Sequence, residues 1–518
     1  MQRPSFIPPP FSVVPFFLLL GWKVVFFILY QFKIEDLWHQ QQLAVHLANG
    51  WGLHYLHASS GDLSHWYTEL LLKWPPLFSI LLAGLLKLHF SLPAATYCIV
   101  FLSLLLLLAS VRIVVRLLQL SEPAQWFLWV ILLLNPVLTD LFSVTDLLSL
   151  ALWITGFALL LQQLMTGKKI PALLLSFLLF LPAAFRYQYY PLVLVLPASV
   201  LLMGFTNRNW KLQKKGIVLL AGVLLLVLIQ GAVLRYVAGS GAYLADTPGG
   251  TVTNLTHMAP FFLYAFIPVY LPVNLLAAPM GMEVQQLYIV TGMVSLLLFV
   301  VFLLLLLRNP ATGKHQVFRF MATLSVAALF VYLCALSLLY QQQVNGGSTF
   351  TYVQEPRYWG IALLLLPLLL VSWMDMNRLT ILPQVALLAL LLNGAPVAYR
   401  LYRTVTETAH PALYSYKTSF KLATDRVIQK DLKTSHLPVV FTCFDSDFGM
   451  LNHTGPYALA SFDSLVNKGT LRMVKPVWFY MITRDTLRPA EAQFIRTNGL
   501  QLKLRQKDWY RLYRLPRS

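Results

Sequence analysis

The stretch RNWKLQKKGIVLLAGVLLLVLIQGAVLRYV, Arg208 to Val237, decides the fold class. Its second part is an uncharged apolar run of about 20 residues, long enough to cross the roughly 30 Å hydrocarbon core of a bilayer as a helix. Its first part holds four bases, which membrane proteins keep on the cytoplasmic side of a span. The stretch therefore predicts a membrane helix with a defined orientation.

The rest of the chain has the composition of a membrane protein. Of its 518 residues, 58% are hydrophobic and only 11% are charged, which is far from the balance of a soluble domain. About eleven apolar runs of roughly 17 to 26 residues lie before residue 397, each long enough to span a bilayer. This composition excludes a soluble enzyme and a fibrous protein, and it predicts an all-α polytopic membrane protein.

The net charge of +19 does not indicate a nucleic-acid partner. The bases form short clusters between the apolar runs and in the C-terminal part, without the aromatic platforms on which nucleic-acid bases stack. We therefore expect no nucleic acid and expect these charges to face anionic membrane lipid.

The clusters of Lys and Arg also predict the topology, because positive residues of short loops stay in the cytoplasm. With Met1 inside and a first span that ends near Phe32, one set of spans places every cluster inside. These spans are expected at 93–111, 124–142, 147–166, 170–186, 187–205, 216–237, 285–307, 318–340, 358–373 and 379–396. The set requires that Pro75 to Phe90, which starts with two prolines, forms an interfacial helix that does not cross.

Residues 397–518 differ in composition and are predicted to form a small soluble α/β domain. This region has 19 bases, 9 acids and no long apolar run. The predicted domains are therefore a membrane module of residues 1–396, with an outer loop at 33–74, and an extracytoplasmic domain of residues 397–518. Within residues 397–518, the hydrophobic patterns predict helices at Tyr416–Lys433 and Pro489–Asn498, strands at Pro438–Cys443 and Val477–Ile482, and a hairpin over Leu500–Leu515.

The outer loop 33–74 opens with two acids, Glu35 and Asp36, directly after the first span. A carboxylate there can act as a general base toward an acceptor hydroxyl; the alternative is a solvated helix cap. The loop also holds five histidines, enough ligands for a divalent metal, although no pair has the i, i+4 spacing of a zinc helix. A metal therefore stays an open alternative.

The run DLWHQQQLAVHLANGWGL, Asp36 to Leu53, and the following KWPPLFSILLAGLLKL, Lys73 to Leu88, resemble a known family. They are similar to the first outer loop of the GT-C glycosyltransferases, in the branch of aminoarabinose transferases and protein O-mannosyltransferases. Two positions depart from the family pattern, because Leu37 and Val45 stand where the family often has Glu and Arg. Glu35 precedes the aspartate instead, so either carboxylate can be the base. The positions that fit are Asp36, Ala44, Gly50, Gly52, Pro75 and Pro76.

Two further segments strengthen the resemblance. LLLNPVLTDLFSVTDLLSLALW resembles the second outer loop of the family, where Asp146 fits the acidic position best and Asp140 is the alternative. QEPRYWGIALLLLPLLL is similar to the start of a late span, although without the resemblance its Glu355 and Arg357 would be a surface ion pair. Arg186, at an outer helix boundary, is either an anchor or a phosphate ligand.

The resemblance implies a chemistry. The donor would be a sugar on polyprenyl phosphate or diphosphate, and Asp36 would deprotonate an acceptor hydroxyl on a lipid, glycan or protein, with inversion. Arg357, in the segment of Glu355 and Tyr358, or Arg186 would stabilise the leaving phosphate. No cofactor is certain, and the reaction would occur on the extracytoplasmic face of a bacterial cytoplasmic membrane. Aromatic residues expected to stack on sugar rings, or to form interfacial belts, are Trp38, Trp66, Tyr187, Tyr189 and Tyr190.

Three other functions remain as alternatives. A transporter or flippase would have as many spans, but carriers usually place ionisable groups near the midplane, where only Lys23 is found. A ligase or polymerase of lipid-linked glycans would share the donor and differ in the acceptor. A non-catalytic scaffold would need no carboxylate at the start of the loop.

Overall fold

The computed structural model describes residues 35–70, 75–134, 144–238, 314–339, 356–377, 413–435, 437–444, 457–507 and 509–515, the short segments 342–344 and 348–350, and single positions within 17–24 and at 297, 384 and 388. The chain forms two compact units. One comprises Met1–Phe32 and Val100–Leu401, and the other comprises Lys33–Ile99 and Tyr402–Ser518. The predicted domain boundaries remain predictions, and the unit that holds the tail also holds residues 33–99.

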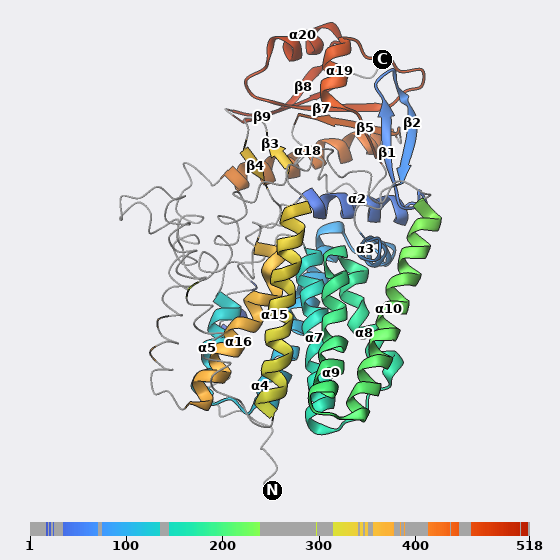
Figure 1. The fold of residues 1–518 in the computed structure, drawn as a ribbon. Coiled ribbons are helices and arrows are strands. Elements are labelled where there is room, and N and C mark those ends of the chain that lie inside the picture. The colour runs from blue at the N-terminus through green and yellow to red at the C-terminus, as the bar shows by residue number, and fades with distance from the viewer. Residues whose placement is uncertain are drawn as a thin grey trace. The chain divides into compact units, whose positions relative to one another are not determined.

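The first unit consists mainly of apolar helices (Figure 1). Five helices of the described chain are long and apolar enough to cross a membrane: Leu92–Leu118, Thr145–Thr166, Tyr187–Thr206, Trp210–Tyr236 and His315–Leu333. They confirm helices at five of the predicted spans. The elements are α4 (Leu92–Leu118), which begins in the second unit, α5 (Glu122–Leu134), α7 (Val144–Thr166), α8 (Ala172–Phe185), η1 (Tyr187–Tyr189), α9 (Tyr190–Thr206), α10 (Trp210–Ala238), α15 (Lys314–Leu339), the hairpin of β3 (Gln342–Val344) and β4 (Ser348–Phe350), η4 (Pro356–Trp359) and α16 (Gly360–Met376).

The remaining predicted spans are less completely described. The spans at 170–186 and 358–373 are the shorter apolar helices α8 and α16, and the one at 124–142 is described only as α5. The first span with Lys23 and the spans at 285–307 and 379–396 lie outside the described residues except for single positions, so eleven crossings stay a prediction.

Glycines hold α8, α9 and α10 close together. A Cβ at Gly216 would lie 2.6 Å from the Leu201 backbone of α9, and one at Gly222 would lie 2.5 Å from Ser176 Oγ of α8. Any side chain at these two positions would push the helices apart. Close backbone approach over small residues is typical of helix packing in membranes, where no hydrophobic force between helices operates.

The second unit is built on a seven-stranded sheet of order β2-β1-β6-β5-β7-β9-β8. The strands β1, β6, β5 and β7 run parallel to one another, while β2, β9 and β8 pair antiparallel. Its elements are α2 (Glu35–Ala48), β1 (His54–Ser59), β2 (Asp62–Leu70), α3 (Leu77–Lys87), α18 (Leu413–Thr434), β5 (Val439–Cys443), β6 (Tyr457–Leu459), α19 (Phe462–Lys468), β7 (Trp478–Arg484), α20 (Pro489–Thr497), β8 (Gln501–Gln506) and β9 (Tyr510–Arg514).

Helices cover both faces of this sheet (Figure 1). Val440 and Phe479 point to a core shared with α19 and α20, whereas Phe441 and Tyr480 point to a core shared with α18. The central strands β5 and β7 are therefore buried on both sides, which is why they read as continuous apolar runs. The helices, strands and hairpin predicted for the tail are confirmed.

The hairpin β1–β2 was not predicted. It joins the sheet of the tail, because β1 pairs in parallel with β6 through His57 and Leu459. The amide of Leu63 also donates to the carbonyl of Arg472 at 2.9 Å. Strands of one sheet must lie on one side of a membrane, which supports the prediction that the loop 33–74 and the tail share a face.

The stretch predicted not to cross forms α3, whose 11 residues span about 16 Å at 1.5 Å per residue. That is about half of the hydrocarbon thickness. The helix packs on α2, where Ser79 Oγ donates to the Gln40 carbonyl at 3.0 Å. Its length is in keeping with an interfacial helix.

Candidate functional site

In the first unit, the structure brings together two of the predicted residues, Asp146 and Arg186. Arg186 Nε lies 2.6 Å from Asp146 Oδ1, and the guanidinium NH2 group lies 3.1 Å from Oδ2. The side chains are 6% and 0% exposed. Two parallel N–H···O bonds of this kind are the strongest form of charge-assisted pairing. Gln188 Nε2 donates to the same carboxylate at 3.1 Å.

Local sequence explains why these groups meet. The helix α8 contains Pro182 and ends at Phe185, and Arg186 has extended backbone (φ −150°, ψ 119°). The chain then turns through η1 into α9, which directs the guanidinium to α7. Asp146 lies in the first turn of α7, where the helix dipole favours a negative charge. The pair therefore joins α7 to the break between α8 and α9.

The aromatic residues beside this pair differ in accessibility. Tyr187 and Tyr190 stack with ring centroids 5.6 Å apart. Tyr189 is only 2% exposed, so the expectation that it stacks on a sugar ring is wrong. Its ring belongs to the core.

Several predicted site residues are only partly described. Arg357 and Tyr358 lie in η4, at the start of α16, and Trp359 beside them is buried. The side chain of Arg357 lies outside the described residues, and so do Asp140 and Glu355 as a whole. Tyr358 is half-buried.

In the second unit, Glu35 and Asp36 form the first turn of α2, and their side chains lie outside the described residues. The helix then buries three polar residues on two of its faces, Gln40 on one and Gln42 with His46 on the other. None of the four amide atoms of the two glutamines has a hydrogen-bond partner among the described residues. An unpaired buried polar group costs about 1–3 kcal/mol. These unpaired amides therefore do not stabilise α2 itself, and they indicate that the buried glutamines have another role.

His46, one of the loop histidines, is held in one tautomer. Its Nδ1 lies 2.6 Å from the carbonyl of His54, and because a carbonyl only accepts, Nδ1 carries the proton. Nε2 is then an acceptor, and it has no partner among the described residues. Burial lowers the pKa of His46, although the hydrogen bond to the His54 carbonyl opposes this shift.

The metal hypothesis finds no cluster within the described part of the chain. No three His, Cys, Asp or Glu residues are grouped there so as to hold an ion. His46 binds a backbone carbonyl, and His57 stacks on Tyr67 at 5.2 Å. The side chains of Glu35, Asp36 and Glu69 are outside this comparison.

Sequence reasoning missed Gln188 and the glutamines of α2. The triplet Gln40-Gln41-Gln42 reads as a solvated helix face, and only packing on α3 and the sheet reveals that Gln40 and Gln42 are buried. Gln188 could have been suspected only from its place two residues after Arg186.

Comparisons with known proteins give one informative result. No protein-family model matches the sequence, and no curated protein matches it. Among solved structures, the crystal structure of ArnT from Cupriavidus metallidurans bound to undecaprenyl phosphate matches with a TM-score of 0.55 at 14% sequence identity, over 99% of each chain. At this identity the likeness concerns the fold. The chain therefore has the fold of ArnT, an aminoarabinose transferase of the GT-C type, with its helical membrane part and a small C-terminal part that contains strands.

Proposed function

We propose that this protein is a membrane glycosyltransferase of the GT-C type, which transfers a sugar from a polyprenyl-phosphate-linked donor to an acceptor hydroxyl. The observation that carries the proposal is the fold match over 99% of both chains to a transferase crystallised with undecaprenyl phosphate. The sequence resemblance of Asp36 to Leu53 points to the same family independently. We place the reaction on the outer face of a bacterial cytoplasmic membrane.

The proposed reaction is a single displacement. Asp36, or Glu35 beside it, takes the proton of the acceptor hydroxyl as the oxygen attacks the anomeric carbon. The bond from that carbon to the phosphate oxygen breaks, and the polyprenyl phosphate leaves with the electron pair. Attack opposite the leaving group inverts the anomeric configuration.

Gln40 is proposed as a positioning residue for the base. It follows Asp36 by four residues in α2, the spacing at which side chains of one helix face meet. Its buried amide has no partner among the described residues, and an amide N–H is a suitable donor to a carboxylate. Because Gln40 is closed to solvent, it would act on the carboxylate rather than on the sugar.

Arg357 is proposed to stabilise the leaving phosphate, because guanidinium stays charged beside a bilayer and offers a fork that matches phosphate. Arg186 is the alternative. Its guanidinium already binds Asp146 through Nε and NH2, which supports a role in holding α7 and α8 together. Glu355 and Tyr358 are proposed to orient Arg357.

Among the described residues, nothing specifically supports the transporter alternative. The buried ion pair lies at the start of α7 and just after the end of α8, not midway along a span, where carriers bind their substrates. A glycan ligase or polymerase would use the same donor site and differ in its acceptor.

The test is incubation of the purified protein with polyprenyl-phosphate sugars and a panel of lipid, glycan and peptide acceptors. Mass spectrometry should detect an acceptor heavier by one sugar together with released polyprenyl phosphate. The Asp36→Asn variant is the control. Movement of intact donor across proteoliposomes without any product would overturn the transferase proposal in favour of a flippase.

A further inference from the structure

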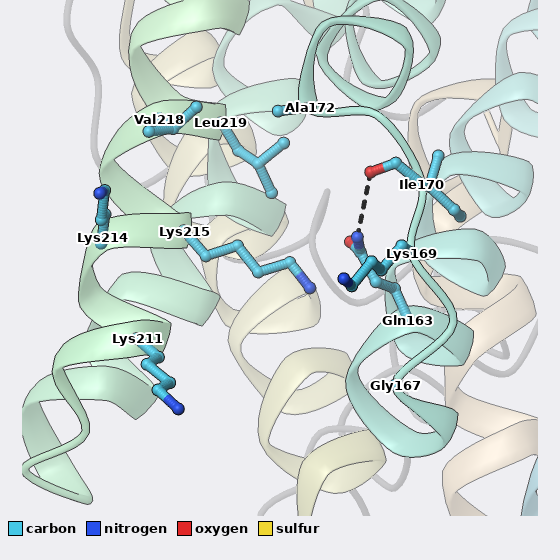
Figure 2. Close-up of a pocket in the computed structure, with 10 residues that line it drawn as sticks. All are labelled: Gln163, Gly167, Lys169, Ile170, Ala172, Lys211, Lys214, Lys215, Val218 and Leu219. Atoms are coloured by element: carbon cyan, nitrogen blue, oxygen red, sulfur yellow. Dashed lines mark hydrogen bonds between the residues drawn. The ribbon is translucent and has the colours of Figure 1, made fainter.

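The first unit contains a cavity of about 440 Å³ at the ends of α7 and α8 that lie away from Asp146 and Arg186 (Figure 2). It lies between the end of α7, the loop into α8 and the first turns of α10. Its lining residues are Gln163, Gly167, Lys169, Ile170, Ala172, Lys211, Lys214, Lys215, Val218 and Leu219.

The charge of this cavity is of one sign. Lys214 and Lys215 lie three and four residues after Lys211, and Val218 lies four and three residues after these two, so the four residues lie toward one side of α10. Lys169 approaches from the loop, and Figure 2 shows Lys215 reaching across the cavity toward it. None of the ten lining residues, all within the described chain, is acidic. The ammonium groups of Lys169 and Lys215 thus face a space without a lining carboxylate, and Lys211 and Lys214 lie along α10 at its edge (Figure 2).

The cavity also contains an unused hydrogen-bond acceptor. Gln163 Nε2 donates to the carbonyl of Ile170 at 3.2 Å, which fixes the orientation of the amide. Its Oε1 is buried and has no partner among the described residues. A buried acceptor of this kind calls for a donor such as a hydroxyl group.

The surface next to the lysines is apolar. Leu173 and Phe177 of α8 are 80% and 46% exposed, and Ile217 of α10 is 47% exposed. The apolar window of α10 is only 17% buried within the protein. Helix faces of this composition meet hydrocarbon in a membrane. The polar cavity therefore adjoins a strip on which acyl chains can lie.

We infer that this cavity binds the phosphate headgroup of an anionic membrane phospholipid, with the acyl chains along α8 and α10. Basic pockets between membrane helices are suited to such headgroups, and the Gln163 acceptor suits a headgroup hydroxyl. The adjoining apolar strip favours a lipid over free phosphate, which would need the lysines alone.

This site is separate from the proposed reaction. Asp146 and Gln163 are 17 positions apart in α7, which corresponds to about 26 Å at 1.5 Å per residue. The charge map places the lysines in the cytoplasm and Asp146 outside. The lipid would thus bind at the opposite membrane surface from the glycosyl donor.

The experiment measures lipid retention by the purified full-length protein, using native mass spectrometry with phosphatidylglycerol, phosphatidylcholine or inorganic phosphate. The variant K211Q/K214Q/K215Q removes three charges, and K430Q/K433Q/K475Q removes three exposed lysines elsewhere as a matched control. The variant Ala172→Trp fills the cavity and keeps every charge. Cysteine labelling verifies that each variant keeps its orientation.

We expect phosphatidylglycerol to bind and phosphatidylcholine not to. The triple cavity variant should weaken binding roughly 100-fold, because each lysine near an anionic lipid contributes about fivefold, and Ala172→Trp should weaken it at least about tenfold. The control should change binding less than about twofold. Equal losses in the control, retention by Ala172→Trp, or displacement of the lipid by millimolar inorganic phosphate would each overturn the inference. Glycosyl transfer is not the readout, so failure here leaves the proposed function untouched.

Discussion

The Asp146–Arg186 ion pair and the two buried glutamines of α2 differ in whether their polar atoms have hydrogen-bond partners. Asp146 and Arg186 satisfy each other through two hydrogen bonds, whereas Gln40 and Gln42 have four amide atoms without a partner in the described chain. A hydrogen-bonded ion pair holds its helices together, whereas unpaired buried amides indicate a further group to which they bind. We therefore assign structure to the first and chemistry to the second.

Substitution of the proposed base tests this contrast with the largest expected effect. Asp36→Asn should lower turnover by about 10²- to 10⁴-fold, the range for loss of a positioned general base. The isosteric amide at the first turn of α2 should leave the melting temperature nearly unchanged. Single-turnover assays with a lipid-linked sugar measure the rate. Full activity in this variant together with loss in Glu35→Gln would move the role by one residue.

Breaking the ion pair should instead act on stability. Arg186→Met leaves the Asp146 carboxylate buried, with Gln188 as its remaining side-chain donor among the described residues, which should cost about 3–5 kcal/mol. Adding Asp146→Leu should restore most of this loss, because an apolar pair avoids the buried charge. Thermal unfolding in detergent measures both variants.

A matched control for that experiment is Arg488→Met. Arg488 pairs with Glu491 and Asp463 but is itself 62% exposed, so its loss should lower the melting temperature far less than Arg186→Met does. A stable double variant that has lost transfer would reassign Arg186 to the leaving phosphate.

The glutamines of α2 allow a finer comparison. Gln40→Leu removes an amide without a described partner, so stability should stay equal or rise by up to about 3 kcal/mol. If the amide orients Asp36, turnover falls by about tenfold and the acid limb of the pH profile moves to higher pH, because the carboxylate loses a donor. Gln41→Leu is the control: its amide donates to Thr96 at 2.9 Å, so it should lose about 1 kcal/mol and keep its rate.

Sequence patterns predicted the helices and strands whose own residues have a clear hydrophobic pattern. Long apolar runs predicted α4, α7, α10 and α15, shorter apolar runs after Pro438 and Pro476 predicted the central strands, and the helical pattern from Pro489 predicted α20. The hairpin β1–β2 was missed although Ser60-Gly61 is a turn signal, because its histidines were considered as metal ligands rather than as strand residues.

Contacts between distant residues could not be predicted in this way. Asp146 and Arg186 are 40 positions apart, and only the turn after α8 brings them together. The same holds for the cavity of Lys169 and Lys215, since the charge rule places both lysines in the cytoplasm but does not place them around one space. Burial of Gln40 depends on packing against α3, which no local pattern encodes.

The smallest expected effect concerns His46, another buried polar residue of α2. Burial holds its pKa below the ordinary value of 6.5 in the folded protein, while the unfolded chain titrates near 6.5. Between these two values the unfolded state binds more protons, so the free energy of unfolding rises with pH in this window. The stabilisation is fully present above about pH 6.5 and is lost as the pH falls toward the folded pKa, with a slope of at most about 1.4 kcal/mol per pH unit for one proton. Thermal unfolding between pH 5 and pH 8 should therefore show a slope that His46→Phe removes and that His65→Gln, at an exposed position, leaves in place. An unchanged slope in His46→Phe would mean that the imidazole titrates alike in the folded and unfolded protein, and His46 would then be open to solvent rather than sealed.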